Sequence, residues 1–278
     1  MKNDPAPTQL AELEALLASI GEIREIGVAV SGGVDSVTLA AVAHAALGDR
    51  VTLFHAQSPA VPQEATARVE ALAAARGWRL QTFDAGEFAR SEYLANPVDR
   101  CFYCKTSLYG SIRARTAAQI VSGTNLDDLG EYRPGLRAAG DHGVRHPYVE
   151  IGATKDMVRA LARELGLGEV AELPAAPCLA SRIETGIGIQ ADMLALVHAS
   201  ERLVGAALGP RTVRCRVRAA GVVMELDGAT LAALEPQRRD ALAGAVGGMF
   251  AGAGLPRPVS FAPYRNGSAF LVRVDERA

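Results

Sequence analysis

The feature that most constrains this chain is a short glycine-containing loop between an apolar run and a helical segment. Ser31-Gly32-Gly33-Val34-Asp35-Ser36 follows apolar residues 26–30, which are typical of a buried strand, and precedes a helical pattern over residues 34–47. A strand that ends in glycine and leads into a helix is typical of parallel α/β sheets. The loop is not the Walker type of phosphate loop, because that motif ends in Gly-Lys-Ser/Thr and this loop contains no lysine.

Strand and helix patterns continue to alternate along the first 170 or so residues. Strands are predicted at 51–54, 78–83, 119–122 and near Tyr148, and helices at 6–20, 63–76, 101–116 and 155–165. This alternation predicts a fold of the α/β class, with a doubly wound, mostly parallel, Rossmann-like sheet.

The pattern changes after about residue 170. Prolines and glycines within residues 171–189 indicate a connector, which carries Cys178. Beyond it we predict a helix at 190–207, a hairpin of strands at 212–217 and 222–226, a helix at 230–246, and strands at 259–264 and 269–274. We therefore expect an α/β domain over residues 1–170, the connector, and a smaller α+β domain over residues 190–278 for substrate binding or oligomerisation.

Composition narrows the class of protein. Apolar residues make up 49% of the chain and the formal net charge is −2, which gives no general attraction to nucleic acid. No apolar run approaches the roughly 20 residues of a membrane span, so we expect no membrane partner. The N-terminus lacks an apolar secretory core, which favours the cytoplasm and reduced or metal-bound cysteines. Lysine is rare, at Lys2, Lys105 and Lys155, so an internal lysine is a candidate for chemistry of its own.

The glycine-containing loop has the properties of an anion site at the carboxyl end of a strand, where open α/β sheets bind ligands. Gly32 and Gly33 allow the backbone to turn tightly and approach an anion. Ser31 and Ser36 add hydroxyl donors beside the N-terminus of the following helix. Asp35 does not suit bare phosphate, but it suits a magnesium ion carried by a nucleotide. The loop therefore predicts a site for ATP and Mg²⁺.

A second polar segment follows the strand predicted at 119–122. It contains Gly123, Asn125, Asp127 and Asp128. Because the carboxyl ends of parallel strands meet at one edge of the sheet, we expect these residues to contact the nucleotide or its magnesium ion.

The four cysteines divide into two groups. Cys101 and Cys104 form a CxxC pair at the start of a predicted helix, and Cys178 lies in the connector. Cys215 falls on a predicted strand and is expected to be a buried packing residue. No second CxxC completes a four-ligand zinc site. A thioredoxin-like dithiol, three unrelated thiols, and a [4Fe–4S] cluster on three cysteines with one open iron remain as alternatives.

Several segments together resemble one family. The loop at Ser31–Ser36 resembles the PP-loop of the ATP pyrophosphatases, which split ATP between the α- and β-phosphates. With it, the chain resembles the LarE family of ATP-dependent sulfur transferases of nickel-pincer nucleotide biosynthesis, from about residue 10 to residue 272. The supporting segments are Asn96–Cys101, Ser122–Asp128, Tyr132–Gly135, Pro174–Arg182, Arg216–Arg218 and Tyr264–Ser268.

The resemblance implies a reaction and its participants. The substrate would be pyridinium-3,5-dicarboxylate mononucleotide, whose carboxylate is adenylated and then converted to a thiocarboxylate. In one mechanism of the family, the cysteine matching Cys178 gives up its own sulfur. In the other, it joins Cys101 and Cys104 on a [4Fe–4S] cluster that delivers sulfide from a separate source. All three cysteines are present here, which favours the cluster. A homo-oligomer is also expected.

Four basic residues are expected to serve this chemistry. Arg216 and Arg218 share one side of a strand and are candidates for a fork that binds substrate phosphate or carboxylate. Arg182 and Lys105 lie near cysteines in the sequence and are expected to stabilise thiolates or contact substrate.

Other classes of function remain open on the sequence. They are a tRNA-thiolating enzyme with the same cysteines, an amidating ligase such as an NAD synthetase, and a nucleotide-sensing or sulfur-carrier module without turnover. The first would need a basic RNA-binding surface, and the second would leave the cysteines unexplained.

Overall fold

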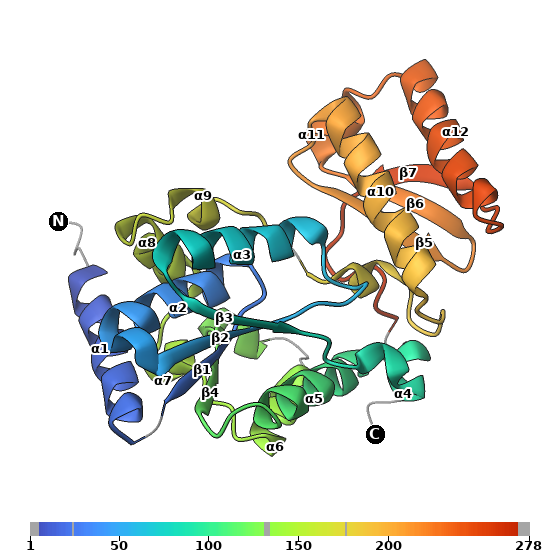
Figure 1. Ribbon diagram of the computed structural model, residues 1–278. Coiled ribbons are helices and arrows are strands. Elements are labelled where there is room, and N and C mark those ends of the chain that lie inside the picture. The colour runs from blue at the N-terminus through green and yellow to red at the C-terminus, as the bar shows by residue number, and fades with distance from the viewer. Residues whose placement is uncertain (1–5, 24, 131–133, 176, 272–278) are drawn as a thin grey trace. The chain divides into compact units, whose positions relative to one another are not determined.

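The computed structural model describes residues 6–23, 25–130, 134–175 and 177–271, in two compact units (Figure 1). Unit 1 comprises Met1–Arg90 and Asp99–Ala176, and unit 2 comprises Ser91–Val98 and Pro177–Ala278. The sequence pattern placed Ser91–Val98 within the first domain, whereas its contacts place it in unit 2. Tyr132, Arg133 and the end of the last predicted strand lie outside the described residues.

Unit 1 is built on a four-stranded parallel sheet with the order β3-β2-β1-β4. The register pairs Ile26 of β1 with Val51 of β2 on one side and with Gln119 of β4 on the other. The chain thus moves outward from β1 to β3 and then returns to the opposite side of β1. The point where the strand order reverses lies between β1 and β4. The strands are β1 (Ile26–Ala29), β2 (Val51–Ala56), β3 (Arg79–Phe83) and β4 (Gln119–Ser122).

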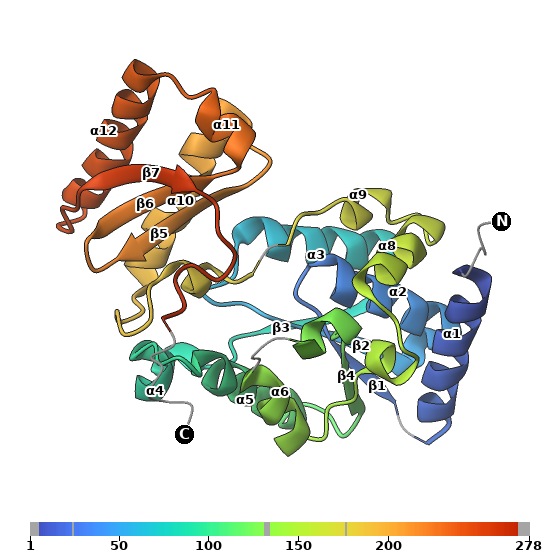
Figure 2. The ribbon, with the colours of Figure 1, turned by 180° about the vertical axis from the view of Figure 1, so that it is seen from behind.

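Helices cover both faces of this sheet, because neighbouring strand residues point to opposite sides and both are apolar. Leu53 packs with the core under α1, α2 and α8, whereas Phe54 packs with the core under α5 and α6. Figures 1 and 2 show the two sets of helices on opposite sides of the strands. The α/β class is confirmed. The helices of unit 1 are α1 (Ala6–Ile23), α2 (Val34–Leu47), α3 (Gln63–Arg76), α5 (Arg100–Arg113), α6 (Pro134–Asp141), α7 (Pro147–Glu150), α8 (Lys155–Glu164) and α9 (Gly168–Ala171), with 3-10 turns η1 (Gly48–Arg50), η2 (Glu87–Ala89) and η3 (Leu126–Gly130).

The strand predicted near Tyr148 is wrong. Arg145 makes a single parallel bridge to Val121, but Pro147 then begins helix α7. Proline has no backbone N–H with which to extend a strand ladder, and it suits the first position of a helix. Tyr148 is fully buried within this short helix.

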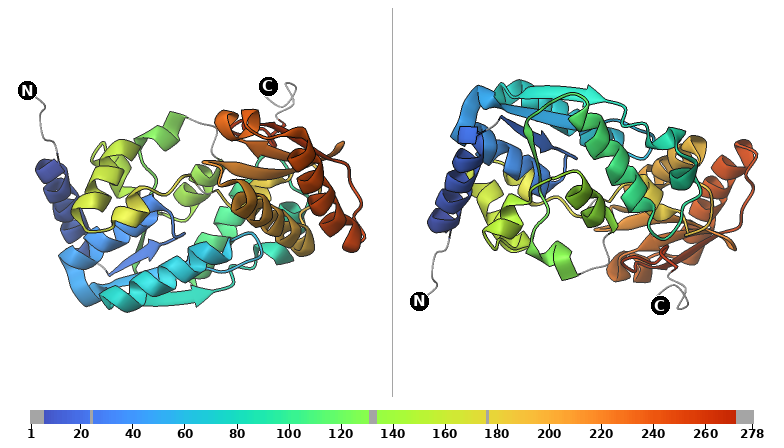
Figure 3. Two further views of the ribbon diagram at one scale, coloured as in Figure 1. Left: turned by 90° about the horizontal axis from the view of Figure 1, so that it is seen from above. Right: turned by 90° about the horizontal axis from the view of Figure 1, so that it is seen from below.

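Unit 2 is a smaller mixed structure. Its sheet has the order β5-β6-β7, with β5 and β6 antiparallel and β6 and β7 parallel. Helix α10 packs on β5, α12 packs on β7, and the two helices pack on each other (Figure 3). The elements are α4 (Ser91–Leu94), η4 (Leu179–Arg182), α10 (Ala191–Leu208), β5 (Val213–Arg218), β6 (Gly221–Leu226), α11 (Gly228–Ala232), α12 (Pro236–Gly252) and β7 (Val259–Pro263).

Two predictions for unit 2 need correction. The helix expected at 230–246 is two helices, because Pro236 cannot continue α11 and instead starts α12. The strand expected at 269–274 is not formed over 269–271, and its remaining residues lie outside the described part of the chain.

Asn96 explains why Ser91–Val98 belongs to unit 2. Its side chain is fully buried and donates hydrogen bonds to the carbonyl oxygens of Glu184 and Ile187, each at 2.9 Å. Its own carbonyl accepts the N–H of Gly186. Its φ of 53° is tolerated by asparagine better than by most residues. Among the described helices, none is both long and apolar enough to cross a membrane.

Candidate active site

The loop after β1 is closed by its own serines. The Ser36 hydroxyl accepts the backbone N–H of Ser31 at 3.0 Å and donates to the carbonyl of Gly33 at 3.2 Å. Gly33 precedes the first turn of α2, whose open N–H groups and positive dipole end favour an anion. The predicted strand, loop and helix are all confirmed, and they lie at the reversal of strand order, where ligands bind in such sheets.

Gly32 is required by its surroundings. Its φ is +83°, and a methyl group at its Cα would lie 2.7 Å from the carbonyl oxygen of Ala65 on α3. The Arg68 side chain, also on α3, donates to the carbonyl of Gly32 at 2.9 Å. His55 links the end of β1 to the same helix through Val30 O and the Thr66 hydroxyl, each at 2.9 Å. Helix α3 thus supports the loop from one side.

The loop after β4 supports it from the other side. A methyl group at Gly123 would lie 2.8 Å from both the carbonyl carbon of Asp35 and the backbone nitrogen of Ser36. The buried Asn125 side chain donates to Asp35 Oδ1 at 3.2 Å. The Asn125 backbone in turn donates to Asp128 Oδ2 at 3.2 Å. The structure therefore brings together the residues that the sequence predicted for a nucleotide and its magnesium ion.

Two residues at Asp35 were not among the predicted site residues. Lys155, which begins α8, forms an ion pair with Asp35 Oδ2. The Tyr148 hydroxyl donates to the Asp35 carbonyl oxygen at 3.1 Å, and burial, with the nearby Asp35 charge, raises the pKa of Tyr148 well above its usual range. The rarity of lysine was the sequence signal for Lys155. No local signal marks Tyr148, because its segment has the apolar pattern of a strand and its contact with Asp35 is made only in the folded chain.

The CxxC pair lies at the start of α5. Cys101 and Cys104 are three residues apart on one helix, so they lie near one face, and both are partly buried. Arg137 lies 3.9 Å over the Phe102 ring between them. Lys105 lies 5.7 Å over the Tyr109 ring of the same helix.

His146 adds a neutral group to this region of unit 1. Burial lowers its pKa, and the charge of Lys105 also lowers it, whereas Glu150 and Asp128 act in the opposite direction. Its Nδ1 lies 2.8 Å from the Ser122 hydroxyl at the end of β4. The arrangement holds the imidazole against the sheet edge that carries Gly123 and Asn125.

Cys178 lies in unit 2, directly before the turn η4. It is partly buried, and its carbonyl accepts a hydrogen bond from Arg182 at 3.1 Å. Arg182 is itself buried and pairs with Glu201 through Nε at 2.9 Å and Nη2 at 3.2 Å. The guanidinium of Arg182 thus connects the backbone of Cys178 to Glu201 on α10.

Arg216 and Arg218 meet the same carboxylate. Arg216 Nε lies 2.9 Å and Arg218 Nη2 lies 3.0 Å from the two oxygens of Glu225 on β6, which confirms that both point to one side of β5. Arg216 is buried and also donates to the carbonyl of Ser181, whereas the Arg218 side chain is 26% exposed. Glu225 therefore offsets much of the charge of the expected fork, and Arg218 is the arginine that remains more accessible.

Glu225 is held in its charged form. Burial acts to raise its pKa, but hydrogen bonds from Ser268 and Arg216, with the charge of Arg216, outweigh burial and lower it. The Ser268 hydroxyl donates at 2.7 Å. A charged Glu225 keeps Arg216 in place.

The cysteines are not gathered within one unit. Among the described residues, no three histidine, cysteine or acidic side chains are grouped as a metal site. Cys101 and Cys104 belong to unit 1 and Cys178 to unit 2. Cys215 is fully buried, as predicted, and burial raises the pKa of its thiol well above the usual range.

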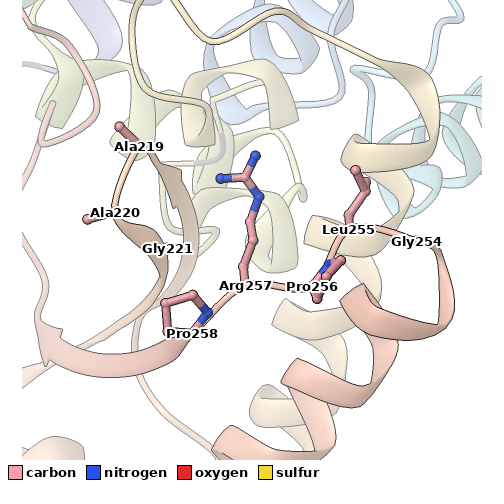
Figure 4. Close-up of a pocket in the computed structure, with 8 residues that line it drawn as sticks. All are labelled: Ala219, Ala220, Gly221, Gly254, Leu255, Pro256, Arg257 and Pro258. Carbon is pink, nitrogen blue, oxygen red and sulfur yellow. The ribbon is translucent and has the colours of Figure 1, made fainter.

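A pocket of about 350 Å³ lies elsewhere in unit 2 (Figure 4). It is lined by Ala219–Gly221 at the β5–β6 turn and by residues 254–258 before β7. Arg257 donates to the carbonyl of Arg218 at 3.1 Å. None of the predicted site residues lines this pocket, which lies beside the β5–β6 hairpin.

Comparisons with known proteins place these features in a family context. No family model matches the chain. An uncharacterized protein of Synechocystis sp. is 35% identical over 195 residues, which cover 69% of this chain and 72% of that protein. The pyridinium-3,5-bisthiocarboxylic acid mononucleotide synthase of Lactiplantibacillus plantarum is 32% identical over 206 residues, which cover 72% of this chain and 74% of that enzyme.

Proposed function

The chain belongs to the family of the pyridinium-3,5-bisthiocarboxylic acid mononucleotide synthase, and on that premise we propose that it is an ATP-dependent sulfurtransferase. Its substrate is pyridinium-3,5-dicarboxylate mononucleotide, and its product is the corresponding thiocarboxylate. The sequence motifs predicted this family, and the identity to the Lactiplantibacillus plantarum enzyme confirms the prediction. The adenylation step and the source of sulfur stay proposals.

The convergence of Asp35, Asn125 and the serine-glycine loop is the observation that carries the nucleotide chemistry. We propose that the loop and the start of α2 bind the phosphates of ATP, and that Asp35 and Asp128 hold Mg²⁺, for which carboxylate oxygens are suitable ligands. Magnesium would neutralise charge on the phosphates. A substrate carboxylate oxygen attacks the α-phosphorus, pyrophosphate leaves, and an acyl adenylate forms.

The second half-reaction replaces AMP with sulfur. A carboxylate resists substitution because its leaving group would be oxide, whereas the adenylate releases AMP. An ionised sulfur nucleophile then attacks the acyl carbon without a strong base. We propose that Arg218, which shares Glu225 with the buried Arg216, contributes to binding the anionic substrate, whereas the buried Arg182 holds the backbone of Cys178.

We propose that Cys101, Cys104 and Cys178 hold a [4Fe–4S] cluster. The donor chemistry is suitable, because the two thiols of α5 are one helical turn apart and all three cysteines are partly accessible. When bound, the cluster would supply sulfide that is already ionised. The alternative is sacrifice of the Cys178 sulfur. That mechanism needs one accessible thiol, and Cys178 is partly accessible.

Product analysis tests the nucleotide chemistry. With MgATP and the dicarboxylate substrate, the protein should form AMP, pyrophosphate and a thiocarboxylate, measured by liquid chromatography and mass spectrometry. Asp35→Asn should abolish AMP formation and retain the fold, whereas Asp49→Asn, the same change at an exposed position of unit 1, should retain activity. Formation of ADP and phosphate by the unaltered protein would contradict the proposal.

Single cysteine variants test the source of sulfur. If the cluster is correct, anaerobically reconstituted protein loses iron and activity on replacement of Cys101, Cys104 or Cys178 by alanine, and keeps both in Cys215→Ala. If Cys178 is sacrificed, only its replacement is fatal. Intact-mass analysis after turnover would then show the loss of hydrogen sulfide at Cys178.

A further inference from the structure

Lys155 stands out because of where the fold places it. It is one of the chain's three lysines, and its side chain reaches Asp35, which lies 120 residues earlier in the nucleotide loop. The loop itself contains no cationic residue. The fold therefore supplies from α8 the positive charge that the loop lacks.

The backbone holds the start of α8 firmly beside the nucleotide loops. The N–H of Lys155 donates to Asp127 Oδ2 at 2.7 Å, and the N–H of Leu126 donates to the carbonyl of Ala153 at 3.0 Å. The Thr154 hydroxyl accepts from the N–H of Met157 and caps the helix. These bonds fix the Cα of Lys155, and its flexible four-carbon side chain extends from there to Asp35.

The ion pair is open to a ligand. The side chains of Lys155 and Asp35 are 31% and 24% exposed, so the pair is not sealed in the core as a structural ion pair would be. Asn125 holds the other carboxylate oxygen of Asp35, and Tyr148 holds its carbonyl. Asp35 is thus fixed from several sides, and the Lys155 ammonium is the contact that can move without disturbing the loop.

The positive charge of Lys155 affects how an anionic ligand meets Asp35. A triphosphate approaching the loop meets the negative charge of Asp35, and a cation close to that carboxylate offsets the repulsion. If Asp35 held Mg²⁺, the metal would neutralise that carboxylate, and the ammonium group beside it would be available to phosphate oxygens.

We propose that Lys155 is a nucleotide-binding residue that contacts the β- and γ-phosphates of ATP when Asp35 ligates the metal. This inference rests on the proposed ATP chemistry and deepens it, because it assigns to α8 the phosphate-binding cation absent from the loop. It predicts that Lys155 contributes to recognition of the pyrophosphate portion and not to that of the adenosine or the α-phosphate.

Binding measurements on charge variants test the proposal. Isothermal calorimetry would compare an ATP analogue with a methylene bridge between the α- and β-phosphates, in the presence of Mg²⁺, with AMP. Lys155→Met should weaken binding of the analogue about tenfold or more, as expected on loss of a hydrogen bond to a charged group, and leave AMP binding unchanged. Lys155→Arg should restore most of the affinity for the analogue.

A matched control removes a positive charge from the same helix. Arg163 is on α8, and its exposed side chain pairs with Glu172 at 2.8 Å. Arg163→Met should bind both ligands as the unaltered protein does. Unchanged analogue affinity in Lys155→Met, or equal weakening of the analogue and AMP, would overturn the inference. Failure of the proposed function has a different signature, since the unaltered protein would then form no AMP and pyrophosphate.

Discussion

At the scale of single residues, Asp35 is where three elements of the proposed nucleotide site meet. Asn125 from the loop after β4, Lys155 from α8 and Tyr148 from α7 each hold a different atom of it. Burial of Asn125 and Tyr148 fixes two of these partners. Asp35 is therefore positioned before a ligand binds, which lowers the ordering cost of binding.

A substitution at Gly123 tests how closely the loop after β4 packs against Asp35 and Ser36. Gly123→Ala should destabilise unit 1 by about 1–3 kcal/mol, the usual cost of forcing atoms into a packed site. The added methyl group would meet the backbone of Asp35 and Ser36 at 2.8 Å, so ATP binding should weaken as well. Urea unfolding and calorimetry measure the two effects.

Gly140→Ala is the control for that substitution. Gly140 is exposed within α6, and a methyl group there meets no atom within 4 Å. It should leave stability unchanged or raise it slightly, because alanine favours a helix more than glycine does. Equal behaviour of the two variants would show that the approach of the β4 loop to Asp35 is not tight.

The cysteines should differ in reactivity. In metal-free protein at neutral pH, iodoacetamide should label Cys101, Cys104 and Cys178, which are partly exposed, and spare Cys215. Cys215 is fully buried and its raised pKa keeps it as a thiol, which is the unreactive form. Peptide mass spectrometry gives the labelled sites, and denaturation should make Cys215 reactive. Native labelling of Cys215 at the rate of the others would contradict its placement.

At the scale of elements, α12 illustrates how unit 2 is held together. Leu242, Val246 and Phe250 are spaced by four residues and form its buried stripe. Phe250→Ala should lower the free energy of unfolding by about 3–5 kcal/mol, because it removes a fully buried aromatic side chain. Gln237→Ala, at an exposed position of the same helix, should have little effect. Circular dichroism during urea unfolding measures both variants, and similar midpoints would rule out this packing.

At the scale of the whole molecule, the loops proposed to bind the nucleotide belong to unit 1, whereas Cys178 and the arginines proposed to bind substrate belong to unit 2. Within unit 2, Glu225 connects distant parts of the chain. It binds Arg216, Arg218 and Ser268, and Arg216 in turn reaches the carbonyl of Ser181 beside Cys178. Its charge state therefore affects much of the unit.

Lowering the pH should reduce the stability of unit 2, because Glu225 becomes protonated. Folding lowers the pKa of this carboxyl below its ordinary value of 4.5, so its stabilising contribution is fully present above that pH and is lost as the pH falls below it. Glu225→Gln should be less stable near neutral pH and should lose less stability than the unaltered protein as the pH falls below 4.5. Urea unfolding at a series of pH values measures this slope. An identical slope in the variant would contradict the shift.

The sequence by itself determined the fold class and much of the secondary structure. The bounds of α2 and α3 agree residue for residue with the prediction, because a glycine directly follows each helix and such stop signals act locally. The loop of Ser31–Ser36 was also predictable, since its strand, glycines and helix are contiguous. The break before α12 was missed although Pro236 marks it in the sequence.

Only the tertiary structure decided which side chains meet. The pairing of Lys155 with Asp35 depends on β4 lying beside β1 and on the path of the chain through α7 to α8. The neutralisation of Arg216 and Arg218 by Glu225 depends on the register of β5 against β6, which pairs Arg216 with Val223 and Arg218 with Gly221. Local patterns fix where a helix or strand begins and ends, whereas contacts between distant residues follow from strand order and register, which buried packing over the whole unit selects.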